Sequence, residues 1–351
     1  MKTKVTKNLL TALALLGTVS AVVGCGTASG ATQAQSSKGK LIFYSAQGYD
    51  SAMAKAFEKK TGIKVQLVDD STGNIVAKME AEKSNPHWDV AWFDGDSTMQ
   101  GLDNEGILLK NWSPSNVSNY TTYGASLIPS DKAYYPASIT AAAAIGYNTK
   151  LVSAADAPKD WSDLLKPAFK DTVAMNDPSI SGPTFPFVAG MLQKDGTKAG
   201  EQFYTQLKQN GMKVFPTNDN TLKALVAGQV KAVMIQDSAL VDAKQKGDPI
   251  QIVYPTSGVF SLPGVISIDK KAPDMAEAKK FAEFVLSQEG QKVMTDPNNG
   301  GGDSYFNPVI KGINPNTARQ QSGIKWVSVS PVQAAQDENS IKKWFHENIT
   351  Q

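Results

Sequence analysis

Cysteine, arginine and histidine are scarce in this sequence of 351 residues, which contains one cysteine, two histidines and, by inspection, the single arginine Arg319. With only Cys25, the chain can form no internal disulfide. His87 and His346 are far apart and match no metal-ligand spacing, so neither a metal site nor another cofactor is expected. A lone arginine near the end of the chain argues against a guanidinium clamp on a carboxylate or phosphate in a central cleft.

Net charge is also nearly absent. The formal charge is +2, but Lys2, Lys4 and Lys7 lie in an N-terminal leader, and without them 32 basic residues face 33 acidic ones, a net charge of −1. A near-neutral chain lacks the electrostatic footprint of a nucleic-acid-binding protein, so that class of partner is excluded. A hydrophobic content of 41% and a charged content of 19% are typical of a globular protein, and the length predicts about two domains.

Familiar catalytic motifs are missing as well. The sequence contains no Gly-x-Ser-x-Gly elbow, no Gly-x-x-x-x-Gly-Lys phosphate loop and no His-Glu-x-x-His pair. The only cysteine lies in the leader and is not available as a nucleophile in a folded domain. We therefore expect no enzymatic activity.

The leader combines a basic start with an apolar run, Leu9 to Val23, of about 15 residues, which is short for a bilayer span of roughly 20. It ends in Val22-Val23-Gly24-Cys25, which resembles a bacterial lipobox and implies that Cys25 is diacylated through its sulfur. The alternative is a signal peptide with an incidental cysteine. Residues 26–38 are rich in Gly, Ser, Thr, Ala and Gln and predict a flexible tether. The expected location is outside the cytoplasmic membrane, with lipid attachment.

Strand and helix patterns alternate between Lys40 and Ser97. The apolar runs 41–44, 63–68 and 89–93 predict strands, and the segments between them have helical periodicity. This order predicts a parallel sheet, in which ligands bind beyond the carboxyl ends of the strands. Small and polar residues follow all three runs and form the predicted binding rim: Ser45, Ala46, Gln47, Ser71, Thr72, Gly73, Asp94, Gly95 and Asp96. Asp94 and Asp96 could hold an ammonium group, or could cap the next helix.

A second α/β unit follows the alanine run 141–144. Its polar loop 176–184 precedes a predicted helix, and free N–H groups at a helix start suit a phosphate or phosphonate, although Ser and Thr also serve as ordinary helix caps. The candidates here are Ser179, Ser181, Gly182 and Thr184, together with Gln236 and Asp237 at a strand end and Tyr254 near the return crossover.

Several phrases in this order resemble the type II extracellular solute-binding proteins of ABC importers. They are the Leu41–Ser45 strand, Phe57-Glu58-Lys59-Lys60-Thr61-Gly62-Ile63-Lys64-Val65, Pro86-His87-Trp88-Asp89-Val90 and Phe281-Ala282-Glu283-Phe284-Val285-Leu286-Ser287-Gln288-Glu289-Gly290-Gln291. The resemblance covers about residues 40–308 and implies an α/β fold of two lobes. Each lobe would be a mostly parallel sheet flanked by helices, joined to the other by crossing hinge strands. It also implies a monomer that captures a small solute and delivers it to a permease and its ATPase.

The implied organisation divides the chain into six parts. These are a signal peptide (1–25), the tether (26–38), the first lobe (39–140), the second lobe (141–257), a return to the first lobe (258–300) and a C-terminal extension of unassigned lobe (301–351).

Within the family, the chain looks closest to the branch that binds ferric iron, thiamine, putrescine and phosphonates. The first loop, residues 44–48, lacks the histidine of the iron proteins, and the strand end Gln236-Asp237-Ser238 lacks their paired tyrosines, which counts against iron. The ligand prediction is a phosphonate or phosphate ester such as 2-aminoethylphosphonate. Iron, thiamine or polyamine receptors remain alternatives, and an enzyme or sensory module on the same fold is a more distant one.

Overall fold

The computed structural model describes residues 39–320 and 322–351. The predicted signal peptide, the lipid site Cys25 and the tether therefore lie outside the described residues. Within the described part of the chain, no helix combines the length and apolar character that a membrane span requires.

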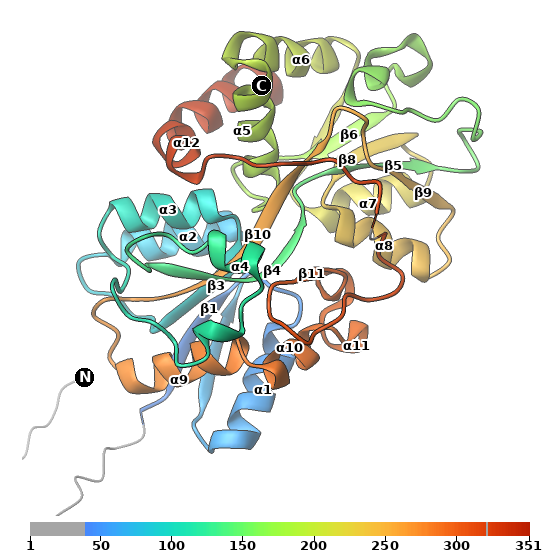
Figure 1. Ribbon diagram of the computed structural model, residues 1–351. Coiled ribbons are helices and arrows are strands. Elements are labelled where there is room, and N and C mark those ends of the chain that lie inside the picture. The colour runs from blue at the N-terminus through green and yellow to red at the C-terminus, as the bar shows by residue number, and fades with distance from the viewer. Residues whose placement is uncertain (1–38, 321) are drawn as a thin grey trace, which may run out of the picture. The chain divides into compact units, whose positions relative to one another are not determined.

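Seven strands form the first sheet (Figure 1). Their order is β11 (Asn307–Pro308), β4 (Tyr134–Ala141), β10 (Val259–Ile268), β3 (Val90–Asp94), β1 (Leu41–Ser45) and β2 (Val65–Asp69), and β12 (Trp326–Val327) pairs separately with β10. The strands β2, β1 and β3 are parallel, as the strand–helix alternation predicts. The strands β10, β4 and β11 join antiparallel, so this sheet is more mixed than expected.

The second sheet has five strands in the order β7 (Lys213–Phe215), β6 (Val173–Asn176), β8 (Ala232–Ile235), β5 (Ala144–Asn148) and β9 (Ile250–Val253). Again three strands are parallel, β7, β6 and β8, and the two strands next to the crossovers are antiparallel. The predicted architecture of two α/β lobes is confirmed, and the antiparallel pairs arise where the chain enters and leaves each sheet.

Helices cover both faces of each sheet, which explains why the central strands are apolar on both sides. In β1, for example, Phe43 and Tyr44 belong to the cores on opposite faces. The helices are α1 (Asp50–Thr61), α2 (Thr72–Ala81), α3 (Asp96–Asn104), α4 (Thr122–Ser126), α5 (Thr184–Asp195), α6 (Thr197–Gln209), α7 (Asn218–Val226), α8 (Asp237–Gln245), α9 (Met275–Val285), α10 (Gln288–Met294), α11 (Pro297–Gly300) and α12 (Pro331–Phe345). Short 3₁₀ turns lie at Val117–Asn119, Trp161–Leu165, Pro167–Phe169 and Gly301–Ser304, and a π-helical turn lies at His346–Thr350.

The chain passes between the sheets at two adjacent places. Between β4 and β5 it runs through the buried alanines 141–144, and between β9 and β10 it returns to the first sheet. The amide of Ala142 donates to the carbonyl of Phe260 at 2.9 Å, so the two crossing segments are hydrogen-bonded to each other. The small alanine side chains permit this close approach. The domain boundaries at 140/141 and 257/258 stay predictions, and these two crossings lie beside them.

The segment beyond residue 300 makes a third connection. Its strand β11 pairs with β4 in the first sheet, and Ala334, Ile341 and Phe345 of α12 belong to the core of the second lobe. From there α12 also reaches α3 of the first lobe, where Thr98 donates to Glu338 at 3.1 Å. Figure 1 shows α12 above α3 and beside α5. The C-terminal extension therefore contacts both lobes.

Candidate functional site

A cavity of about 420 Å³ lies between the two sheets. First-lobe elements supply Ala46, Gln47, Gly48, Asp50, Asp69, Asp70, Ser71, Thr72 and Asp94, and the turn Gly301–Ser304 adds Asp303. Second-lobe elements supply Ile180, Ser181, Gly182, Pro183, Thr217, Asn218, Asp219 and Gln236. Most of these residues follow the carboxyl ends of β1, β2, β3, β6, β7 and β8, which is where parallel strands place a ligand site.

The first-lobe wall carries most of the charge. Asp69 and Asp70 follow β2, Asp94 ends β3, and Asp50 begins α1. Asp303 comes from more than 200 residues further along the chain and accepts a hydrogen bond from the amide of Gly48 at 2.6 Å. Among the described residues that line the cavity, none is lysine, arginine or histidine. The cavity is therefore strongly acidic.

Asp94 is at the centre of this wall and is hydrogen-bonded from both lobes. Its Oδ1 accepts from the Gln47 side chain at 3.0 Å, and its Oδ2 accepts from the Gln236 side chain at 2.9 Å. Gln47 is oriented in turn by the Tyr49 hydroxyl, which donates to Gln47 Oε1 at 2.6 Å. Burial raises the pKa of Asp94 to about 6, although the two amide donors oppose that rise.

Other carboxyls of the cavity are also difficult to ionise. Burial and then the charge of Asp69 raise the pKa of Asp50 to about 6. Burial and then the charge of Asp94 raise the pKa of Asp303 to about 7. Burial and the adjacent Asp70 also raise the pKa of Asp69. A positive charge in the cavity would reverse these shifts, because it stabilises the ionised carboxylates.

The second-lobe wall consists mainly of amides and hydroxyls. Gln236 Nε2 also donates to Thr140 at 3.0 Å, and its Oε1 accepts from Asn218 at 3.0 Å. Asn176 extends the network to Asn218 at 2.6 Å and to the Ser181 hydroxyl at 3.1 Å. This network fixes neutral donors and acceptors opposite the carboxylates.

The two walls touch at the rim of the cavity. The amide of Gly73 at the start of α2 donates to the carbonyl of Ile180 at 3.1 Å. A β-carbon on Gly73 would lie 2.3 Å from the Ser179 carbonyl oxygen, and one on Gly182 would lie 2.3 Å from the Thr72 hydroxyl. Only glycine permits this approach of the backbones. The lobes are therefore closed on each other.

Half of the sixteen ligand-binding residues predicted from the sequence line the cavity. They are Ala46, Gln47, Ser71, Thr72, Asp94, Ser181, Gly182 and Gln236. The other eight, Ser45, Gly73, Gly95, Asp96, Ser179, Thr184, Asp237 and Tyr254, are not on its wall. Some of these support the wall: the buried Ser45 hydroxyl accepts from the Gln47 amide, and Gly73 and Ser179 belong to the rim contact.

Asp237 and Tyr254 have a different role from the one predicted. Asp237 forms a fully buried ion pair with Arg319 at 2.6 Å, and its other oxygen accepts from the Ala141 amide at 2.9 Å. The Tyr254 hydroxyl also donates to Asp237, at 3.1 Å. Arg319 additionally donates to the Tyr305 carbonyl and to the side chain of Asn307 in β11. These residues join the lobes beside the crossovers, so the charge of Asp237 is already neutralised.

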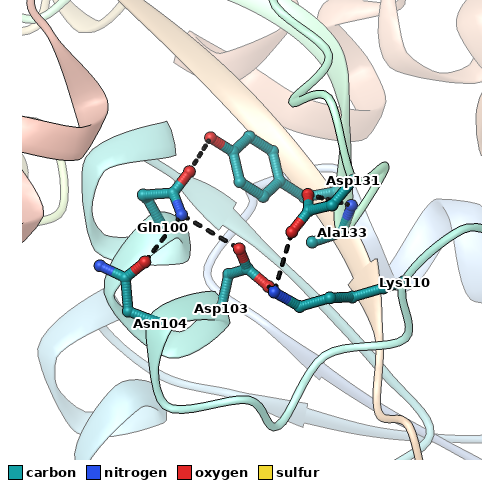
Figure 2. A network of polar contacts seen from close by, with 7 residues as sticks. Gln100, Asp103, Asn104, Lys110, Asp131 and Ala133 are labelled. Carbon is teal, nitrogen blue, oxygen red and sulfur yellow. Dashed lines mark hydrogen bonds and ion pairs between the residues drawn. The ribbon is translucent and has the colours of Figure 1, made fainter.

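Asp96 belongs to α3 rather than to the cavity rim. It lies in the first turn of that helix, where burial raises its pKa to about 7. Further along α3, Gln100 donates to Asp103 and Asn104, and Lys110 bridges Asp103 and Asp131 (Figure 2). This network attaches α3 to the segment before β4. We interpret the polar residues of α3 as structural.

The residues that sequence reasoning missed are chiefly acidic. Asp69 and Asp70 follow a predicted strand, so their position was a usable signal. Asp50 and Asp219 begin helices and read as ordinary first-turn acids. Asp303 follows the glycine run 300–302, and nothing in the local sequence indicates that it reaches the cavity.

In the part of the chain that the structure describes, no group of three or more His, Cys, Asp or Glu side chains is placed to hold an ion. These residues therefore form no preformed metal site. His87 and His346 are both outside the cavity and exposed or partly exposed.

The match to a family model defines the class of protein. Residues 52–318 match the model described as bacterial extracellular solute-binding protein, and the chain belongs to this family. Proteins of this family capture small solutes outside the bacterial cytoplasm for ABC importers. The predicted family and its solute-binding role are confirmed.

Individual relatives differ in the solutes that their names state. A Salmonella typhimurium protein named "Putative 2-aminoethylphosphonate-binding periplasmic protein" is 28% identical over 67% of this chain and 68% of its own length. The spermidine/putrescine-binding periplasmic protein of Escherichia coli is 26% identical over 73% of this chain and 75% of its own. The structure of the periplasmic binding protein AfuA from Actinobacillus pleuropneumoniae, with fructose-6-phosphate bound, superposes with a TM-score of 0.81. It is 21% identical and covers 90% of this chain and 99% of that one, and this likeness shows the fold.

Proposed function

We propose that the protein is the receptor of an ABC importer for a small solute that carries a protonated amine. The observation that carries this proposal is the composition of the cavity wall, where six aspartates meet no cationic side chain among the described residues. Several of these carboxyls have raised pKa values because burial, and for Asp50 and Asp303 also the charge of a neighbouring aspartate, disfavours their ionised forms. An ammonium group supplies that charge and donates hydrogen bonds to the carboxylate oxygens.

Two solute types satisfy this requirement. A polyamine such as putrescine places an amine at each end. 2-Aminoethylphosphonate places its amine at the carboxylates and its phosphonate at Ser181, Gly182 and the N-terminus of α5, as the sequence predicts. The second candidate is favoured by these hydroxyl and glycine residues on the cavity wall and by the name of the Salmonella relative. A phosphate ester without an amine is disfavoured, because its two negative charges would face the aspartates unpaired.

Matched ligand pairs test the proposal by isothermal titration calorimetry. The first pair is 2-aminoethylphosphonate and ethylphosphonate, which differ by the amine alone. The second is putrescine and butylamine, which differ by one of two amines. We expect at least one amine to bind and its matched partner to bind at least 30-fold more weakly. Two outcomes would overturn the amine requirement. One is equal binding of 2-aminoethylphosphonate and ethylphosphonate, and the other is tight binding of fructose 6-phosphate without binding of either amine.

The same proposal includes attachment by lipid at Cys25, a monomeric state and no turnover of the solute. It is supported by the lipobox-like sequence and by the family's binding role. Replacing Cys25 by alanine should move the protein from the membrane fraction to the soluble fraction of the cell. Recovery of unmodified solute after prolonged incubation with the protein is the expected result for a receptor.

A further inference from the structure

Asp50 differs from every other carboxylate of the cavity. Its side chain is 3% exposed, yet its Oδ2 has no hydrogen-bond partner among the described residues. In contrast, Asp94 accepts from Gln47 and Gln236, and Asp70 accepts from the Ser71 amide and the Asn74 side chain. A buried carboxylate oxygen without a donor destabilises the fold by an amount that a satisfied one does not.

The position of Asp50 does not explain this arrangement by itself. As the first residue of α1, Asp50 interacts favourably with the helix dipole, but that role needs no burial. Burial and then the charge of Asp69 raise the pKa of Asp50, and burial, the charge of Asp94 and to a lesser extent that of Asp50 raise the pKa of Asp303. Three carboxyls from α1, β2 and the turn Gly301–Ser304 thus line the same cavity, and among them only Asp50 has a buried oxygen without a hydrogen-bond partner in the described part of the chain.

We propose that Asp50 directly contacts the amine of the captured solute and provides the acceptor that makes this end of the cavity specific for a cation. This inference rests on the proposed function, since it assigns a residue to the amine site of the same cavity. The ammonium group of the solute would donate the hydrogen bond that Asp50 Oδ2 does not receive from the described residues. Stability is sacrificed at this position for binding, a pattern typical of functional residues.

The test compares Asp50→Asn with Asp96→Asn, a control that makes the same change at another buried first-turn aspartate, one that does not line the cavity. Affinity for putrescine and for 2-aminoethylphosphonate is measured by calorimetry, and the melting temperature of the empty protein by scanning calorimetry. We expect Asp50→Asn to weaken binding of the preferred amine at least 30-fold and to raise the melting temperature of the empty protein. We expect Asp96→Asn to change affinity less than threefold.

The outcomes separate the two proposals. If the wild-type protein binds neither amine, the proposed function fails. If the wild type binds an amine and Asp50→Asn binds it equally well, only the assignment of Asp50 fails. If Asp50→Asn lowers the melting temperature of the empty protein as well as the affinity, Asp50 is a structural helix-start residue, and the assignment is again overturned.

Discussion

The two walls of the cavity are built from different chemistry. The first-lobe wall and the turn Gly301–Ser304 carry five of the six aspartates, whereas the second-lobe wall presents Ser181, Thr217, Asn218 and Gln236 with the single carboxylate Asp219. Both walls lie at strand ends and helix starts, so secondary structure does not cause the difference. The two walls differ in which of their carboxylates can contact a solute.

This contrast suggests a division of labour. A charged wall can attract and hold a cationic solute, because Coulomb attraction acts over several ångströms. A neutral wall can then close over it without burying further unpaired charge, since its amides are already hydrogen-bonded to one another. Closure also removes water from the ion pair and strengthens it. Five experiments test this contrast.

The largest effect is expected at Arg319, which neutralises Asp237. Asp237 is the strand-end carboxylate of the second lobe that does not line the cavity. Replacing Arg319 by methionine leaves Asp237 as a buried charge without its guanidinium partner. We expect the free energy of unfolding to fall by about 3–5 kcal/mol, measured by denaturant titration. The double variant Arg319→Met/Asp237→Asn should recover part of that loss. If the double variant is as unstable as the single one, the buried charge is not the cause.

The next effect is the pH dependence of binding. The carboxyl pKa values are about 6 for Asp50 and Asp94 and about 7 for Asp303. A bound cation lowers these pKa values, so binding releases protons. Affinity for the amine should reach its maximum above about pH 8 and should be at least tenfold lower at about pH 5. Protonation of a single carboxyl with a pKa of about 6 is enough to cause that tenfold loss. Calorimetry in buffers of different ionisation enthalpy measures the released protons. An affinity that rises on acidification would indicate an anionic solute.

The same carboxyls have the opposite effect on the stability of the empty protein. Their folded-state pKa values exceed the unfolded value of about 3.9, so the folded state binds more protons between about pH 4 and pH 7. Their contribution to stability is therefore present at low pH and lost as the pH rises through 6 to 7. In Asp50→Asn, the part due to Asp50 should disappear from the pH profile of the melting temperature.

A smaller effect is expected where the walls meet. Gln236→Ala removes the hydrogen bond from the second lobe to Asp94, and a hydrogen bond to a charged group contributes about 1.5–3 kcal/mol. We expect amine affinity to fall about tenfold, mainly through faster dissociation, measured by stopped-flow fluorescence. Gln251→Ala is the matched control, because Gln251 lies on β9 away from the cavity wall and its side chain accepts a hydrogen bond from the exposed Lys244. Equal dissociation rates for the two variants would show that closure does not depend on Gln236.

The smallest effect is expected at Asp219, the only carboxylate on the second-lobe wall of the cavity. Exposed charges interact weakly, so Asp219→Asn should weaken amine binding by no more than about fivefold, or 1 kcal/mol. Asp303→Asn, the same change on the charged wall, should have a larger effect on calorimetric affinity. If the two variants lose equal affinity, the division between the walls is wrong.

Much of this protein follows from its sequence. The apolar runs 41–44, 63–68 and 89–93 require strands because they alternate with amphipathic helices, and polar residues after each strand must then gather at one edge. That logic gathers Gln47, Ser71, Thr72 and Asp94 at one edge, and in the structure all four line the cavity. It also selects the loop that brings Ser181 and Gly182 there.

Tertiary structure alone decides which of these groups remain available. Asp94 and Asp237 occupy similar positions at strand ends, but Arg319 folds back across 82 residues to neutralise only Asp237. Asp303 reaches the cavity because the chain returns to the first sheet, and Gly73 is required because the opposite lobe approaches within hydrogen-bond distance. Local sequence determines where strands end. The distant contacts that determine the charge of the cavity depend on how the whole chain folds, and no local pattern encodes them.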